Sequence, residues 1–100
     1  MLNWRRKIEE FKDDDKAFLR WIAANSAGYV LNCYKSTAKS GGPWMLHEAT
    51  CHTLEKPNLT TGQYYKVCST DRQELVQWAD KERLEKAYDT ALQICKKCNP

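Results

Sequence analysis

Two short pairs of metal-binding residue types constrain this chain more than any other feature. Three residues separate His47 from Cys51, and two residues separate Cys95 from Cys98. Structural zinc sites use four tetrahedral nitrogen and sulfur ligands in two such pairs, because each pair closes a chelate within one turn of the chain. We therefore expect one structural Zn²⁺ that closes a loop of 43 residues and supplies folding free energy on the order of 10 kcal/mol. The expected ligands are His47, Cys51, Cys95 and Cys98.

Other cysteines and histidines compete for these roles in the sequence. Cys33 and Cys68 lie in β-rich runs, so burial in the core is the expected role of both thiols. Cys68 stays open as a replacement for His47, and His52 stays open because it directly follows the first ligand pair. The alternative to a metal site is a redox-active CxxC pair that stands alone.

Length and composition predict one small intracellular domain over residues 1–100. A chain of 100 residues has room for one core. Five cysteines, an odd number, favour thiol or metal chemistry over a disulfide framework. No run resembles a signal peptide or reaches the ~20 apolar residues of a transmembrane helix, so we expect a cytoplasmic protein without membrane contact. The net charge of +3 argues against a polybasic protein but permits a local basic patch.

The order of helix and strand signals predicts an α+β fold. The expected elements are helices over 3–12 and 16–25, strands over 29–34, 44–47 and 63–68, a helix that begins at 69–71 and a second C-terminal helix over 84–94. Asp13–Asp15 are expected to cap the helix over 16–25, and Gly28 to lie beyond its end. The prediction is a small three-stranded antiparallel sheet flanked by N-terminal and C-terminal helices and stapled by one zinc ion, with residues 1–28 as a helical N-terminal segment.

Two motifs in the chain resemble those of Ada-like zinc modules. These are the metal-binding domain of the bacterial DNA alkylation-repair protein Ada and similar domains attached to nucleases. The motifs are Met45-Leu-His-Glu-Ala-Thr-Cys51 and Ile94-Cys-Lys-Lys-Cys-Asn-Pro100. The resemblance covers about residues 44–51 and 94–100, with the strand–helix order between them. It implies that residues 29–100 form an Ada-like module with a structural zinc ion.

The sequence departs from the Ada-like pattern in two ways. His47 stands where the family has the cysteine that accepts a methyl group from DNA, and an imidazole cannot replace a zinc-activated thiolate in that transfer. The separation between the two ligand pairs is also longer than in the family. The resemblance therefore implies a fold and a metal rather than an activity.

A set of cations, hydroxyls and aromatic residues predicts a nucleic-acid interface. The loop after residue 34 combines lysines, hydroxyls and glycines, a composition that wraps phosphates. We expect lysines near the zinc knuckle to lie on the same side of the sheet, where exposed aromatic rings can stack on bases. The candidate binding residues are Lys35, Ser36, Lys39, Trp44, Lys66, Lys96 and Lys97. We therefore expect the chain to bind nucleic acid, in a context of DNA repair, restriction or phage conflict.

Two other functions stay open. The chain binds a protein partner or acts as an inhibitor through exposed Trp44, Trp78 or Tyr88, or it is a zinc-thiolate alkyl acceptor or redox protein. Enzymatic activity is not expected, because the sequence has no Walker loop, GxSxG elbow or HExxH motif. Four protein ligands also leave zinc no open position for catalysis. The oligomeric state is not predicted.

Overall fold

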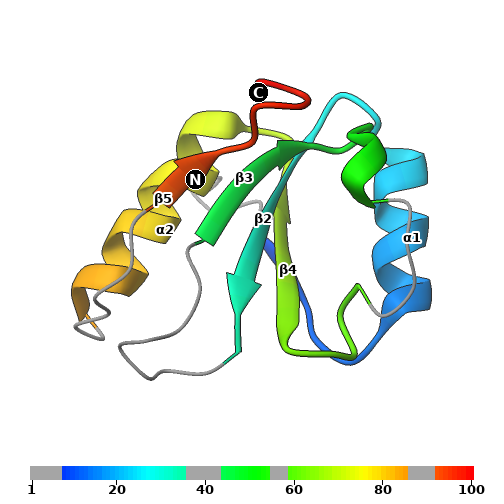
Figure 1. The fold of residues 1–100 in the computed structure, drawn as a ribbon, viewed down its shortest axis with the longest axis horizontal. Coiled ribbons are helices and arrows are strands. Elements are labelled where there is room, and N and C mark those ends of the chain that lie inside the picture. Colours follow the sequence, from blue (N-terminus) through cyan, green and yellow to red (C-terminus); the bar gives the residue numbers. More distant parts are fainter. Residues whose placement is uncertain (1–7, 36–43, 55–58, 86–91) are drawn as a thin grey trace, which may run out of the picture.

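The structure is a computed structural model, and it describes residues 8–35, 44–54, 59–85 and 92–100. Figure 1 shows a sheet with the two helices of these residues at its sides, so the α+β class is confirmed. The elements are, in order, β1 (Glu9–Phe11), α1 (Asp15–Ala24), β2 (Tyr29–Tyr34), β3 (Trp44–Glu48), the 3₁₀ turn η1 (His52–Leu54), β4 (Tyr64–Ser69), α2 (Arg72–Glu85) and β5 (Leu92–Ile94).

The described residues form a five-stranded mixed sheet with the strand order β1-β4-β2-β3-β5. Neighbouring strands are antiparallel from β1 to β3, whereas β5 runs parallel to β3. The three central strands β4, β2 and β3 are those that the sequence predicts. The expectation of three antiparallel strands is nevertheless wrong, because two short edge strands extend the sheet and one of them is parallel.

The first edge strand, β1, replaces the end of the helix predicted over 3–12. Its three residues pair with β4, with Glu9 opposite Cys68. Phe11 turns its ring toward Phe18 of α1, at a centroid separation of 5.9 Å. Pairing satisfies backbone groups of β4 that would otherwise lie at a sheet edge. The N-terminal segment thus contributes a strand to the sheet, and residues 3–7 lie outside the described part.

The second edge strand, β5, replaces the end of the helix predicted over 84–94. Helix α2 runs without interruption to Glu85, and Leu92–Ile94 then pair with β3. Leu92, one of the apolar positions that suggested a helix at this end, belongs to the sheet. Leu92 packs against the core under α2, and Ile94 lies opposite Leu46 in the ladder. Residues 86–91 lie outside the described part.

Helix α1 begins as the aspartate run predicts. The side chain of Asp14 caps it by accepting a hydrogen bond from the Ala17 amide at 3.1 Å. Asn25 caps the C-terminal end of the helix, and its backbone N–H donates to the Trp21 carbonyl. Gly28 follows, and its φ is not positive. A residue without a side chain fits there for a steric reason, because a Cβ atom would lie 2.7 Å from the Trp21 ring.

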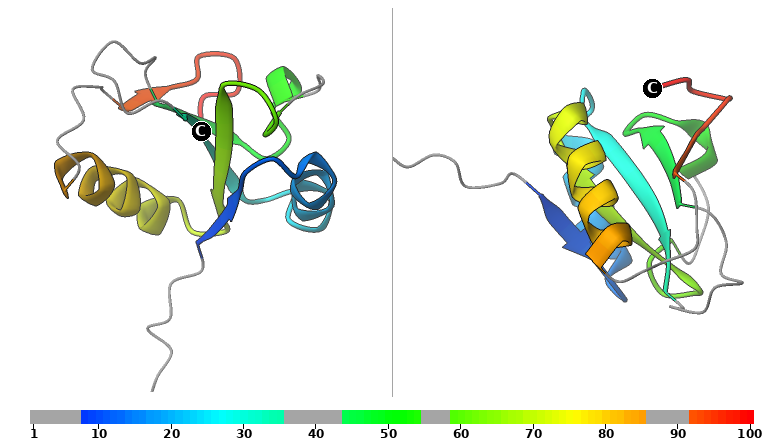
Figure 2. Two further views of the ribbon diagram at one scale, coloured as in Figure 1. Left: turned by 90° about the horizontal axis from the view of Figure 1, so that it is seen from below. Right: turned by 90° about the vertical axis from the view of Figure 1, so that its left-hand side faces the viewer.

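Alternating side chains of the sheet form two hydrophobic clusters, one on each face. Helix α2 covers the first face, where Trp44 and Trp78 stack with ring centroids 5.9 Å apart. Helix α1 and the turn η1 cover the second face, where Phe18 and Val30 are fully buried. Figure 2 shows the two helices on different sides of the strands. Candidate functional residues gather on the second face, beyond the part that α1 covers.

Candidate metal centre and the adjoining cavity

The first ligand pair leaves the end of β3. His47 lies on the face opposite Leu46, as strand alternation requires, and the chain turns directly after Glu48. The Cys51 amide donates to the Glu48 carbonyl at 3.0 Å, and the Leu54 amide donates to the Cys51 carbonyl at 3.0 Å. These two turns hold Cys51 beside His47. The expected pairing of a residue at a strand end with a residue in the following turn is present.

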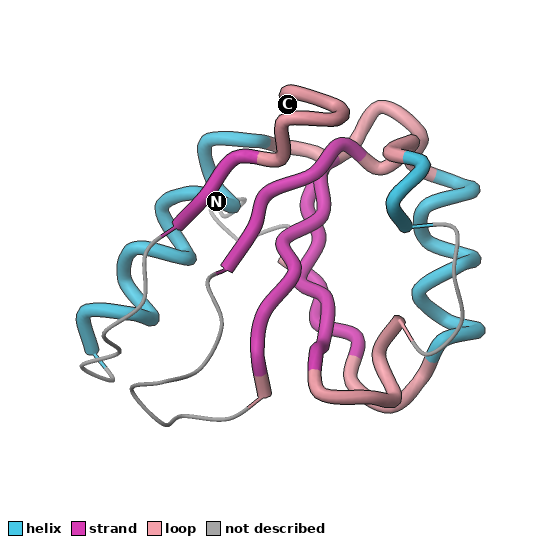
Figure 3. The backbone as a smooth tube through the Cα atoms, viewed as in Figure 1, coloured by secondary structure: helices cyan, strands magenta, loops and turns pink. Residues whose placement is uncertain are grey.

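The parallel pairing of β3 with β5 brings the second pair to the same place. Because Ile94 lies opposite Leu46, the next residue, Cys95, arrives beside His47. The Cys95 amide continues the ladder by donating to the Leu46 carbonyl at 2.9 Å. Figure 3 shows the loop after β5 close to the loop after β3. The chain then closes a tight turn, in which the Asn99 amide donates to the Cys95 carbonyl at 2.9 Å.

Four side chains from these two turns form a cluster that can hold one metal ion. Their ligand atoms all lie within 4.8 Å of one another. The Sγ atoms of Cys51 and Cys95 are 3.9 Å apart, and the Glu48 amide donates to Cys98 Sγ at 3.2 Å. The cluster is formed by His47, Cys51, Cys95 and Cys98, the four residues that the sequence predicts. Only Cys98 is more than slightly exposed to solvent.

The two thiols of the CxxC pair differ in acidity. Burial raises the pKa of Cys95, but hydrogen bonds from the Cys98 and Lys97 amides and from neighbouring thiols outweigh it, so the net pKa is lowered. Burial, opposed by the Glu48 amide and reinforced by the neighbouring cysteines, raises the pKa of Cys98 to about 12. Crowded sulfurs cannot all carry charge without a counterion. A divalent cation bound at this cluster would replace their protons and remove this conflict.

The competing ligands lie elsewhere. Cys68 and Cys33 are fully buried in the hydrophobic clusters on the two faces of the sheet, and burial raises the pKa of both. His52 is exposed and is not part of the cluster. His47 therefore keeps its expected place, and the two core assignments are confirmed.

Thr53 is a residue of the site that the sequence gave no reason to single out. Its hydroxyl lies 3.0 Å from Cys51 Sγ and 3.3 Å from His47 Nδ1. It therefore orients the imidazole and one thiol together, as groups behind metal ligands do. The only available signal was its position two residues after Cys51.

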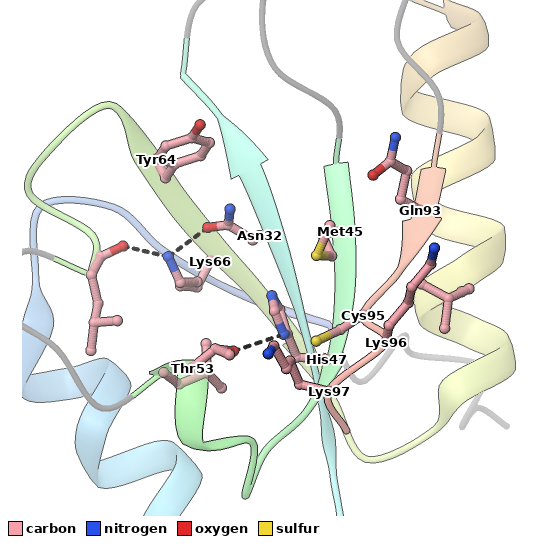
Figure 4. Close-up of a pocket in the computed structure, with 13 residues that line it drawn as sticks. Asn32, Met45, His47, Thr53, Tyr64, Lys66, Gln93, Cys95, Lys96 and Lys97 are labelled. Carbon is pink, nitrogen blue, oxygen red and sulfur yellow. Dashed lines mark hydrogen bonds between the residues drawn. The ribbon is translucent and has the colours of Figure 1, made fainter. Parts of the chain in front are cut away.

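A cavity of about 690 Å³ adjoins the metal cluster on the same face of the sheet (Figure 4). Its lining contains three lysines and, among these described residues, no aspartate or glutamate. Lys66 is 3% exposed, and its ammonium donates to Asn32 Oδ1 and to the Leu59 carbonyl, each at 2.6 Å. Lys96 and Lys97 are exposed at the rim. The lining residues are Asn32, Met45, His47, Thr53, Leu54, Leu59, Tyr64, Lys66, Gln93, Ile94, Cys95, Lys96 and Lys97.

Seven residues are predicted to bind nucleic acid, and of the five that the structure describes it brings together Lys66, Lys96 and Lys97. Lys35 lies apart from the cavity and pairs with Asp13 at 2.7 Å. Trp44 is 2% exposed, so the expectation that its ring is exposed for stacking on bases is wrong. The Trp44 ring is instead buried under α2. Ser36 and Lys39 lie outside the described residues.

The two described residues among the anchors expected for a protein partner, Trp44 and Trp78, are also buried. Trp78 is 7% exposed and stacks on Trp44, so neither indole offers an anchor on the surface. Tyr88 lies outside the described residues. Large aromatic residues fill a small core here, because helix α2 has to cover a sheet face with few side chains.

The chain matches no protein-family model, no curated protein and no solved structure. The resemblance to Ada-like zinc modules stays a prediction. Within the described residues, no helix has the length and apolar character needed to cross a membrane.

Proposed function

We propose that this chain is a non-catalytic, zinc-stabilised module that binds nucleic acid on the face of the sheet beside the metal centre. The observation that carries the proposal is that the cysteine and histidine cluster and three lysines lie side by side on one face of the sheet. A four-residue cysteine and histidine cluster holds the loop that presents Lys96 and Lys97, and a third lysine lies in the adjoining cavity.

The donor set supports zinc as the metal. Three thiolates and one imidazole make a closed tetrahedral site of the kind that structural zinc prefers. Zinc–sulfur bonds of about 2.3 Å place tetrahedral ligands about 3.8 Å apart. The Sγ atoms of Cys51 and Cys95 lie 3.9 Å apart, which fits such a site. Burial of these two thiols fits a structural role better than alkyl transfer or redox chemistry.

The charge of the cavity supports an anionic partner. Lys96 and Lys97 are exposed, so they reach phosphates that pass over the rim. Lys66 adds positive charge from inside, although the nearby Asp15 carboxylate offsets part of it. Nucleic acid is the partner that combines repeated phosphates with groups able to enter the cavity. A role in DNA repair, restriction or phage conflict is the context that the resemblance to Ada-like modules suggests. The odd number of cysteines favours the cytoplasm as its location.

Binding of labelled DNA and RNA to zinc-loaded protein at several salt concentrations tests the proposal. We expect affinity to fall steeply with salt, because bound lysines release counterions. Lys96→Glu with Lys97→Glu should reduce the slope of log affinity against log salt by about 1.4 for a single strand, about 0.7 for each phosphate contact.

Lys81→Glu is the matched control, because Lys81 is exposed on α2 and that helix covers the opposite face. It should leave both affinity and salt slope close to those of the original protein. A flat salt response of the original protein, or an equal loss in Lys81→Glu, would contradict nucleic-acid binding at this face.

A further inference from the structure

On the basis of the proposed function, we infer that the cavity beside the metal centre takes one unpaired nucleotide of a bound strand, with its base inside and its phosphate at the lysine rim. This assigns a ligand class, a nucleoside phosphate within a single strand, to a specific cavity.

The size of the cavity fits a single nucleotide. Small-molecule sites enclose about 300–1,000 Å³, and this cavity of about 690 Å³ lies within that range. A base within a duplex is stacked on both faces, so it has to leave the stack to enter such a space. The cavity therefore favours a strand whose bases are already free.

The lining has separate apolar and polar parts, as a nucleotide does. Met45, Leu54 and Leu59 offer apolar surface to the faces of a base. Gln93 and Asn32 carry amide groups, which hydrogen-bond to the edges of bases. In Figure 4, Gln93 projects from β5 while Asn32 lies across the cavity on β2. An anion without an apolar part, such as inorganic phosphate, would leave most of this lining unused.

An aromatic ring lies at the end of the cavity away from the metal centre. Tyr64 lines the cavity, and its ring packs edge-on against Tyr34 with centroids 5.2 Å apart. Tyr64 and Lys66 are two residues apart on β4, so they point to the same face. Cross-strand pairing places Asn32 opposite Lys66, which sets these three groups in one wall. A held aromatic ring beside a cationic group is a usual arrangement for an unstacked base.

The metal centre forms the opposite wall. His47 and Cys95 belong both to the metal cluster and to the lining, and Thr53 contacts the cluster from within the lining. Lys96 and Lys97 lie between the two cysteines of the second ligand pair. Binding of the metal would therefore fix the rim that meets the phosphate, and a nucleotide held there should in turn raise the affinity for the metal.

The experiment measures the affinity of zinc-loaded full-length chain for a short single strand, a blunt duplex of the same sequence, a nucleoside 5′-monophosphate and inorganic phosphate. We expect the single strand to bind at least tenfold more tightly than the duplex and more tightly than the monophosphate. The monophosphate should in turn bind more tightly than inorganic phosphate. If the free monophosphate binds as tightly as the single strand, the proposal that the nucleotide belongs to a strand is overturned. If inorganic phosphate binds as tightly as the monophosphate, the proposal that a base enters the cavity is overturned.

Two pairs of variants locate the site. Met45→Trp fills the cavity and should weaken single-strand binding by about 5- to 150-fold, the worth of one stacked base. Met45→Leu conserves volume and should bind as the original protein does. Gln93→Glu adds a negative charge at the exposed cavity edge and should weaken binding, whereas Gln77→Glu, the same change at an exposed position on α2, should not.

The outcomes separate this inference from the proposed function. Salt-dependent binding that is equal for strand and duplex, and indifferent to Met45→Trp and Gln93→Glu, overturns the cavity as a nucleotide site but leaves a nucleic-acid surface. Absence of binding to every nucleic acid overturns both. Zinc content and circular dichroism establish that each variant is folded. If Met45→Trp does not fold, the comparison of Gln93→Glu with Gln77→Glu tests the cavity instead.

Discussion

Removal of the metal should destabilise the whole chain by an amount that the usual affinity of structural zinc bounds. Structural zinc binds small sites with a standard free energy of about 10–16 kcal/mol. At a free zinc concentration of about 1 μM instead of the 1 M standard state, binding is less favourable by about 8 kcal/mol. The remaining stabilisation is about 2–8 kcal/mol. A permanent cross-link around the 43 residues between Cys51 and Cys95 gives about 4 kcal/mol from loop closure, which falls within this interval.

Thermal unfolding of chelated and zinc-reloaded protein, followed by circular dichroism, measures this difference. One kcal/mol shifts the Tm of a domain of this size by about 4–8 °C, so the chelated protein should melt at least about 8 °C lower. Reloading with zinc should restore the original Tm. An apo form that melts within about 2 °C of the zinc form, with metal removal established by elemental analysis, would refute the idea that the metal stabilises this fold.

Three substitutions test other parts of the account. Trp44→Ala should cost about 3–5 kcal/mol in urea unfolding, because the ring is buried in the core, and the salt slope of nucleic-acid binding should not change. Gly28→Ala should cost about 1–3 kcal/mol, because the added methyl meets the Trp21 ring at 2.7 Å; an unchanged urea midpoint would contradict the close contact. Hydrogen bonds from Thr60 lower the pKa of Asp15, so its stabilisation is present above the unfolded pKa of about 3.9 and is lost as pH falls toward the folded value. Asp15→Asn should therefore lower the urea midpoint at pH 7 and show a smaller deficit at pH 3, and an equal deficit at both pH values would contradict this role.

The parts of the fold that the sequence predicts are those with strong local signals. The strands over 29–34 and 63–68 come from β-rich runs, and alternation along the second correctly places Tyr65 and Val67 on the face opposite Tyr64 and Lys66. The aspartate cap of α1 is equally local. The ligand spacing singled out four residues that the fold does bring together, although the identity of the metal stays a prediction.

The parts that the sequence does not predict depend on partners distant in the chain. A three-residue strand such as Glu9–Phe11 is too short to show a period, and its pairing with β4 defines it. Leu92–Ile94 continue a helical spacing of apolar residues, but pairing with β3 decides their conformation. One clue was available: Cys95 has to reach the end of β3, which an extended segment beside that strand achieves directly. The burial of Trp44 depends likewise on α2 crossing its face of the sheet.

The most direct measurement is the metal content of protein purified without chelators, by elemental mass spectrometry, together with four single variants. We predict one zinc ion per chain in the original protein, and its loss in Cys51→Ser and Cys98→Ser. Full occupancy should persist in Cys68→Ser and His52→Ala, since neither residue belongs to the cluster. Less than stoichiometric zinc in the original protein, or equal loss of zinc from Cys68→Ser, would contradict a metal centre formed by these two turns.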